Sequence, residues 1–388
     1  MNGTRVLALG LVAGLLAQCG CSDGSTDPSA PRALTVTGGN LQTGCPLSPL
    51  PESLEVTLTG SDDHPLAGAP VGWQVTSGSA TLSSTVRTTD AAGRSRVQLT
   101  LGLALTPIAV LATVGALPAA TFSATSRVVS FGLGQTTTST LNASSCTLLG
   151  GGSFDAYALT LTGSQGFTVS LASDSFDAAL EVVDEGFVLG GAYNFDSVPG
   201  RGITNSFLKM IAVRGAYGIA AAAQNLGGAG SYTLTTAARP VYADSCLNNI
   251  WVTRGITTQQ ELKSTDCVDG TGPYYFDAFQ MVLVAGQKVT ITESSAAFDA
   301  MLFLHSTSGK IVFDDNSGGG TNARLSYTNT SSGAEQLSIL PSTATVGATG
   351  AYTLTIDPAV VTASGGTTTL LFGTLKAPRH FGGALRSR

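Results

Sequence analysis

The sequence predicts an all-β protein: tandem β-sandwiches that follow an N-terminal signal peptide. Segments such as 53–59, 97–101 and 288–292 alternate apolar residues with Thr, Ser or Gln, which is the pattern of a half-buried strand. Clusters of Gly, Asn, Asp and Pro separate these segments at short intervals. A chain of 388 residues with this pattern has room for several sandwich domains.

The composition excludes several classes of protein. The net charge of −6 is not that of an electrostatic nucleic-acid binder, so no nucleic-acid partner is expected. The hydrophobic content of 43% is too high for a mostly disordered chain. With three His and no Gly-x-Ser-x-Gly, His-Glu-x-x-His or Walker motif, we expect no enzyme. A hydrolase would need an unrecognised cleft with paired carboxylates.

Residues 1–21 have the charge and apolar pattern of an export signal. Arg5 precedes the apolar run 6–17, which is too short for a membrane span of roughly 20 residues. Small residues and two Cys gather where the run stops, so it resembles a bacterial lipoprotein signal; the alternative is an ordinary cleaved signal. The resemblance implies acylation of either Cys21 or Cys19 and a lipid anchor as the only membrane contact. The protein would be exported to the outer membrane or cell surface, or would face the periplasm.

Residues 22–32 are polar and turn-rich, and are expected to form a flexible tether. The next segment, 33–126, carries a GNLQ turn at 39–42, a Pro-led strand at 50–56, and a hairpin that leads into a Trp-containing strand at 65–73. These motifs resemble those of bacterial immunoglobulin-like (Ig-like) domains of the intimin/invasin type. The resemblance implies a β-sandwich that acts as a spacer or stalk unit. Alternation in its strand predicts that Trp73 lies in the core.

The remainder of the chain repeats itself. FDAY at 154–157 matches FDAF at 276–279, and FDAAL at 176–180 matches FDAML at 298–302, both at an offset of 122 residues. GSYTL at 230–234 matches GAYTL at 350–354 at an offset of 120. This order of matches predicts a tandem duplication, with copies at about 128–238 and 241–357.

Each copy resembles the pre-peptidase C-terminal (PPC) domain, a small β-sandwich or jelly-roll appended to secreted proteins. The second copy fits better, with FDAF at 276–279, FDAML at 298–302, FDDN at 313–316 and GAYTLTI at 350–356. Asp155 and Asp277, in the FDAY and FDAF motifs, are predicted to accept backbone N–H groups and so fix a turn.

The sequence suggests no cofactor apart from a Ca²⁺ ion, which the acidic loop of the second copy could bind. Calcium takes six to eight oxygen ligands, and carboxylates near one edge of a sandwich could supply several of them. The alternative is a set of structural Asx-turns. The candidate ligands are Asp299, Asp314, Asp315 and Asn316.

Export places the remaining Cys in an oxidising compartment, where they can pair. Cys246 and Cys267 lie just before and just after the opening strand of the second copy, and a disulfide there would tie that strand to its sandwich. Cys45 and Cys146 could pair as well, which would cross-link the Ig-like domain to the first copy.

The tail, 358–388, is expected to be disordered. We interpret the chain as a non-catalytic, surface-anchored binding or adhesion protein, whose partner is a polysaccharide or protein of the cell envelope or extracellular space. Tyr193, Tyr274 and Tyr275 are the aromatic residues expected on a binding face. The alternative is a structural spacer or accessory subunit for a secreted enzyme.

Overall fold

The computed structural model describes residues 30–102, 106–147, 152–184, 192–194, 205–224, 227–241, 250–268 and 272–357. These residues form 31 β-strands and no helix, which confirms the predicted all-β fold class. The part of the chain described here therefore holds no helix long and apolar enough to cross a membrane. The predicted signal and tether up to residue 29, with Cys19 and Cys21, lie outside the described residues, as do Cys246 and the tail 358–388.

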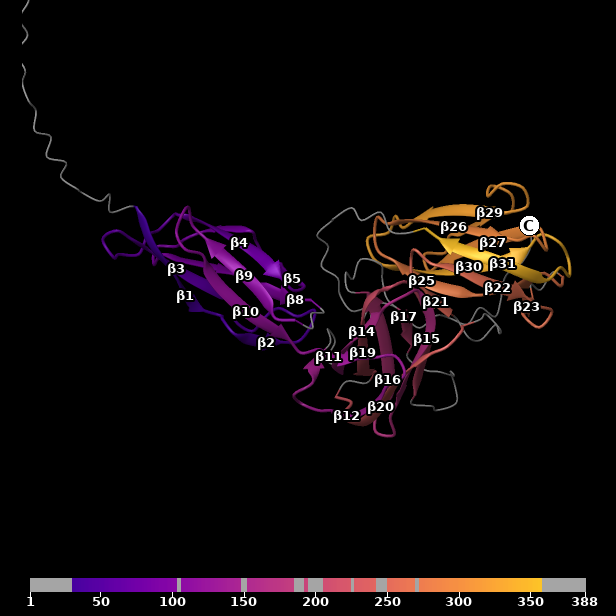
Figure 1. The fold of residues 1–388 in the computed structure, drawn as a ribbon, viewed down its shortest axis with the longest axis horizontal. Helices are drawn as coiled ribbons and strands as arrows, with labels where there is room; N and C mark the ends of the chain where they lie inside the picture. The colour runs from indigo at the N-terminus through magenta and orange to yellow at the C-terminus, as the bar shows by residue number, and fades with distance from the viewer. Residues whose placement is uncertain are drawn as a thin grey trace, which may run out of the picture.

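Strands β1 to β10 form a β-sandwich, which is the segment predicted to be Ig-like, is called the Ig-like domain below and is drawn in indigo and purple in Figure 1. One sheet has the order β1 (Pro31–Gly38), β3 (Leu54–Gly60), β7 (Arg94–Val97). The second has the order β2 (Gln42–Gly44), β10 (Ala120–Ser126), β9 (Ile108–Thr113), β4 (Pro70–Ser77), β6 (Val86–Thr88), and β5 (Ala80–Leu82) pairs with β8 (Leu99–Leu101). Trp73 is 2% exposed and its ring lies 5.5 Å from that of Phe122, so its predicted place in the core is confirmed.

Strands β11 to β20 form the first repeat as two packed sheets. The first sheet has the order β11 (Val129–Phe131), β14 (Ser153–Leu161), β19 (Gly215–Ala223), β16 (Ala178–Asp184), β17 (Ala192–Asn194), with β13 (Cys146–Thr147) also on β14. The second has the order β12 (Thr136–Leu141), β20 (Gly230–Ala238), β15 (Gln165–Ala172), β18 (Ser206–Ala212). Leu159 and Ile219 from the first sheet meet Phe167 and Leu208 from the second in one core.

Strands β22 to β31 repeat this arrangement, in orange and yellow in Figure 1. One sheet has the order β22 (Thr257–Leu262), β31 (Gly350–Ile356), β26 (Lys288–Ser294), β29 (Ala323–Thr328). The other contains β23 (Cys267–Val268), β24 (Tyr275–Phe276), β25 (Phe279–Leu283), β30 (Glu335–Thr343), β27 (Ala300–Ser306) and β28 (Ile311–Asp314). The order β22-β31-β26-β29 matches the order β12-β20-β15-β18 of the first repeat.

The two repeats share one continuous sheet. Strand β21 (Ile250–Val252) pairs in parallel with β18 of the first repeat and with β25 of the second. Because successive side chains of a strand point to opposite faces, β21 serves two cores. Trp251 belongs to the core of the first repeat, whereas Ile250 and Val252 belong to the core of the second. The repeats are therefore joined by shared packing as well as by the chain.

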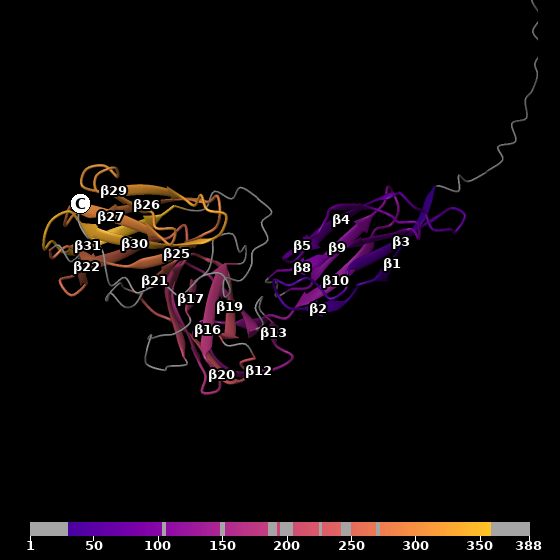
Figure 2. The same ribbon diagram turned by 180° about the vertical axis from the view of Figure 1, so that it is seen from behind.

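The Ig-like domain is tied to the first repeat covalently. Cys45 and Cys146 form a disulfide with a Cα–Cα distance of 5.6 Å, which confirms the predicted cross-link. Beside it, the guanidinium of Arg127 donates to Cys45 Sγ at 2.8 Å and to the backbone oxygen of Ser144. Figures 1 and 2 show the Ig-like domain at one end of the molecule, with the first repeat between it and β22 to β31. Cys267 is disulfide-bonded, and its pairing with Cys246 stays a prediction.

Tyr and Asp residues of the matched motifs meet inside each repeat. Tyr232 donates from its hydroxyl to Asp155 at 2.7 Å, and Tyr352 donates to Asp277 at 2.5 Å. The prediction that Asp155 accepts backbone N–H groups is wrong, since its donors are the hydroxyls of Tyr232 and Ser139. Burial and these hydrogen bonds raise the pKa of both Tyr232 and Tyr352 well above the ordinary value for tyrosine. The motif that marks the duplication thus fixes the closing strand of each sandwich.

Candidate functional site

The predicted calcium ligands Asp299, Asp314, Asp315 and Asn316 all lie among the described residues, and calcium binding there stays a prediction. No group of three His, Cys, Asp or Glu side chains among the described residues could hold a metal ion. The Asp314 carboxylate accepts from the backbone N–H groups of Ser317 at 2.9 Å, in its own loop, and of Arg324 at 2.7 Å, on β29. Burial opposes its ionisation, but these hydrogen bonds and one from the Ser317 hydroxyl lower the pKa of Asp314. The side chains of the other three predicted ligands make none of these hydrogen bonds: Asp315 and Asn316 are exposed, and Asp299 is half-buried.

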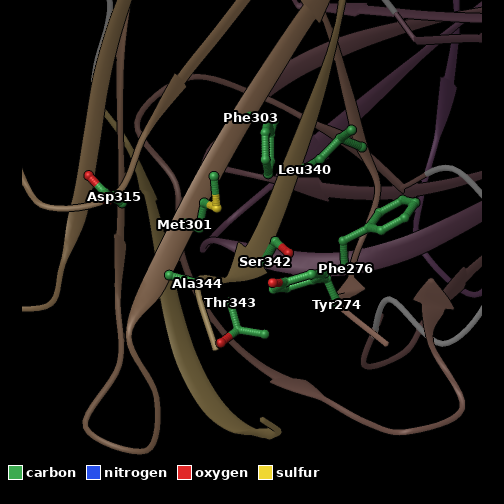
Figure 3. Close-up of a pocket in the computed structure, with 9 residues that line it drawn as sticks. All are labelled: Tyr274, Phe276, Met301, Phe303, Asp315, Leu340, Ser342, Thr343 and Ala344. Carbon is green, nitrogen blue, oxygen red and sulfur yellow. The ribbon is translucent and has the colours of Figure 1, made fainter. Parts of the chain in front are cut away.

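A pocket of about 310 Å³ opens on the outer face of the second repeat, and we call it the aromatic pocket. Its walls come from β24, β27 and β30, from the segment before β24 and from the residue that follows β28 (Figure 3). Asp315 stands at one side of it, and Tyr274 and Phe276 at the other (Figure 3). The lining residues are Tyr274, Phe276, Met301, Phe303, Asp315, Leu340, Ser342, Thr343 and Ala344.

Alternation in β27 explains why apolar side chains lie outside the core. Ala300, Leu302 and Leu304 are fully buried between the two sheets. Met301 and Phe303 must therefore point to the opposite face of the sheet, where they are half-buried. Because this strand is apolar on both faces, one face forms the core and the other forms the floor of the aromatic pocket.

The apolar face extends from the pocket onto β28. Phe303 lies directly opposite Phe313, and their ring centroids are 5.9 Å apart. His305 lies directly opposite Ile311 in the same ladder. Phe313 is 63% exposed and Ile311 is 59% exposed, although residues of this size are usually buried. An exposed apolar patch beside a hollow is typical of an interaction site.

Most of the polar groups in the aromatic pocket are already bonded to the protein. Ser342 donates its hydroxyl to the backbone oxygen of Tyr275 at 2.8 Å. Thr343 donates to the backbone oxygen of Thr345 at 3.2 Å and accepts from its N–H at 3.0 Å. Among the described residues, neither the Asp315 carboxylate nor the Tyr274 hydroxyl has a hydrogen-bond partner. A ligand would therefore meet apolar walls, one carboxylate and one phenol.

The matching face of the first repeat is closed. In the strand registers, Met301, Leu340 and Ser342 of the second repeat correspond to Ala179, Ala220 and Ala222 of the first. These three small residues are buried in a cluster with Phe154 and Cys146, and Cys45 of the Ig-like domain packs against that cluster. The first repeat thus uses this face to hold the Ig-like domain. The second repeat carries larger side chains there, and among the described residues they line the aromatic pocket.

The sequence pointed to only part of this site. Tyr274 does line the pocket; Tyr275 is half-buried and does not line it, and the side chain of Tyr193 lies outside the described residues. No prediction from the sequence covered Met301, Phe303 or Phe313, which also form this face. The signal that could have found them is the replacement of Ala179 and Glu181 in the first copy by Met301 and Phe303 in the second, at alternate positions of one strand.

A second unusual group lies behind the pocket wall. Glu293 is fully buried, its Oε2 accepts from the N–H of Ser342 at 3.3 Å, and its Oε1 has no hydrogen-bond partner. Burial, with a contribution from nearby Asp277, raises the pKa of Glu293 well above the ordinary range for glutamate. The Glu293 side chain is 0% exposed, so it is a feature of the core rather than of the pocket surface.

Neither of the two histidines among the described residues lines the aromatic pocket. His64 lies in an exposed turn, with Nδ1 3.1 Å from the backbone oxygen of Asp62. His305 is half-buried in β27, and burial lowers its pKa. His380 lies outside the described residues.

No family model matches the chain, and no curated protein matches it. Among solved structures it is similar to the pre-peptidase C-terminal domain of collagenase from Bacillus anthracis, at 15% identity over 28% of this chain and 93% of that one, with a TM-score of 0.23. It is also similar to the D0-D1 domain of intimin, at 12% identity over 53% of this chain and 98% of that one, with a TM-score of 0.20. At identities and TM-scores this low, the similarity does not indicate what this protein binds or does.

Proposed function

We propose that this protein is a non-catalytic, surface-anchored binding protein that holds its ligand on the outer face of the second repeat. The observation that carries the proposal is the aromatic pocket together with the exposed Phe313 and Ile311 beside it. Apolar side chains in water cost free energy, at roughly 25 cal/mol for each Å² that a ligand could cover. The matched face of the first repeat is covered by a neighbouring domain, which supports the idea that this face is built to be covered.

A second candidate function, that of a spacer, is favoured by the way the three domains are joined. The Cys45–Cys146 disulfide fixes the Ig-like domain to the first repeat. The continuous sheet through β21 fixes the first repeat to the second. Such an assembly would hold the aromatic pocket at a set distance from an N-terminal lipid anchor, so the two functions are compatible.

A sedimentation experiment tests the binding function. Residues 22–388, which include every described residue, are mixed with insoluble polysaccharides and with isolated cell envelopes, with and without EDTA. We expect retention on at least one of these materials. Phe313→Ala should reduce it severalfold, because the substitution removes the most exposed aromatic side chain of the face.

The matched control is Val86→Ala in the Ig-like domain, since Val86 is also an apolar side chain with 57% exposure. It should leave retention unchanged. Retention that Phe313→Ala does not alter would place the binding elsewhere on the protein. Absence of retention on every material would favour the spacer function. Retention that EDTA abolishes would support the calcium prediction at Asp299, Asp314, Asp315 and Asn316.

A further inference from the structure

The disulfide between Cys45 and Cys146 has a positively charged neighbour. Nη2 of Arg127 lies 2.8 Å from Cys45 Sγ, and the same guanidinium donates to the backbone oxygen of Ser144. The backbone N–H of Arg127 donates to the backbone oxygen of Gly44 at 2.8 Å, so both ends of this residue are held beside the sulfur. The cluster that packs around the disulfide is apolar. Arg127 thus places a positive charge directly against Cys45.

This charge affects the two redox states of the disulfide unequally. A sulfur in a disulfide carries no net charge, whereas a reduced cysteine can ionise to a thiolate. A guanidinium makes a charge-assisted hydrogen bond to an anion, and a positive group beside a cysteine favours its thiolate. A disulfide becomes easier to reduce when its reduced form is stabilised. The contact of Arg127 with Cys45 therefore favours the reduced form of the pair.

The two cysteines differ in their access to solvent. Cys146 is 4% exposed within the apolar cluster, whereas Cys45 is half-buried. Thiol–disulfide exchange starts when a thiolate attacks one sulfur of the disulfide, and access helps to decide which sulfur is attacked. An incoming thiolate therefore reaches Cys45 more easily than Cys146.

The disulfide reinforces a short connection between two independent cores. Strand β10 ends at Ser126 and β11 begins at Val129, so the chain between the domains consists of residues 127–128. The Ig-like domain and the first repeat each have a hydrophobic core of their own. Beside the disulfide, Leu47 packs against Val183 of the first repeat. Reduction would therefore leave two folded domains that are joined by a short linker and a small noncovalent contact.

We infer that the Cys45–Cys146 disulfide is a redox-sensitive joint, in which Arg127 favours opening by stabilising the thiolate of Cys45. The reductant is a dithiol. One of its thiolates attacks Cys45 Sγ, the S–S bond breaks, and Cys146 leaves as a thiolate and takes up a proton. The second thiolate then attacks the reductant sulfur that is bound to Cys45, and Cys45 leaves as a thiolate beside Arg127. The dithiol gives up two electrons and becomes a disulfide, and its two thiol protons pass to Cys146 and to the solvent.

The first test measures reduction in the native protein. Residues 22–388 are equilibrated at pH 8.5 with mixtures of reduced and oxidised dithiothreitol, and free thiols are alkylated and assigned by peptide mass spectrometry. Cys267, which is disulfide-bonded and 3% exposed, is the internal reference. We expect Cys45 and Cys146 to become reduced at a lower proportion of reduced dithiothreitol than Cys267. Amide exchange in β3 and β19 should stay slow, and reduction that occurs only with loss of this protection would overturn the inference.

Substitution of Arg127 separates its electrostatic effect from a structural one. Arg127→Ala should lower the equilibrium constant for reduction by about three- to tenfold at pH 8.5. It should have almost no effect at pH 6, where ordinary cysteine thiols are protonated. If Arg127 only held the joint together, its removal would instead make reduction easier at both pH values, and that result would overturn the inference.

Two further variants serve as controls for this measurement. Arg127→Lys keeps the charge and should retain part of the wild-type equilibrium constant. Arg87→Ala removes the same charge from β6, which lies at the opposite edge of the sheet from β2, and should change nothing. An equal effect of Arg87→Ala and Arg127→Ala would contradict a specific contact with Cys45.

Small-angle X-ray scattering tests whether the disulfide controls the joint. Reduction should broaden the distribution of distances within the wild-type protein, and replacement of both Cys45 and Cys146 by Ser should have the same effect without a reductant. A scattering curve that reduction leaves unchanged would overturn the inference, because noncovalent contacts would then fix the two domains. The inference goes beyond the proposed binding function, and retention that depends on Phe313 would stand whichever result is obtained here.

Discussion

Trp251 lies in the second repeat's opening strand but completes the first repeat's core, so its removal should weaken both repeats. It is 6% exposed. A buried Trp covers roughly 150–250 Å², which at about 25 cal/mol per Å² corresponds to roughly 4–6 kcal/mol. That figure is an upper bound, because the unfolded chain already hides part of this surface. We expect Trp251→Ala to lower the free energy of unfolding of the joined repeats by about 3–5 kcal/mol.

Hydrogen-exchange mass spectrometry can locate this loss. Amide exchange should accelerate in β15 and β18 of the first repeat as well as in β25 of the second, because all three lie in the sheet that β21 completes. Trp73→Ala, in the core of the Ig-like domain, is the matched control and should accelerate exchange only there. If Trp251→Ala destabilised the second repeat and left β15 at its normal rate, the shared-core reasoning would be refuted.

Three further predictions concern stability. Replacing Cys45 and Cys146 by Ala removes a cross-link between residues that are 101 apart in the sequence. Chain entropy predicts that the free energy of unfolding falls by about 4–5 kcal/mol. Urea unfolding of the Ig-like domain and first repeat measures this change, and equal stability of the two proteins would contradict it. Glu293→Gln should stabilise the second repeat at pH 7 and above but not at pH 4. The pKa of Glu293 is raised in the folded protein, so the free energy of unfolding of the wild-type protein falls as pH rises above about 4.3, the ordinary glutamate value. Gln carries no charge and avoids this loss. Thermal unfolding across pH checks this, and parallel curves for both proteins would count against it. Tyr352→Phe should lower the free energy of unfolding by about 1.5–3 kcal/mol, because it removes a hydrogen-bond donor to buried Asp277. If calorimetry showed no change, this hydrogen bond would not stabilise the fold.

The strand pattern was predictable because it depends on local alternation. The segment 53–59 alternates apolar residues with Glu and Thr, and β3 buries Leu54, Val56 and Leu58 while Glu55 and Thr57 stay half-buried. The same rule placed Trp73 correctly in the Ig-like core. Burial of alternate residues needs only that one face of the strand is packed, so no knowledge of the partner strand is required.

The aromatic pocket was not predictable in the same way. The run Met301 to Leu304 is apolar at every position, so its pattern shows that both faces of the strand are apolar but not what covers the second face. In the first repeat, Cys45 of the Ig-like domain packs on that face; in the second, no described residue of another domain lines the pocket there. The bonding of Asp314 was not predictable either, because one of its donors, the N–H of Arg324, lies on another strand.

The sequence by itself determined the all-β class, the internal repeat and the possibility of the Cys45–Cys146 cross-link, because local alternation, self-similarity and the number of Cys are properties of the sequence. Only the tertiary structure decided that β21 joins two sheets into one, that Trp251 belongs to the preceding repeat, and which sheet face stays open. Those features depend on contacts between distant segments, and a strand's own pattern does not specify the partner that packs against it.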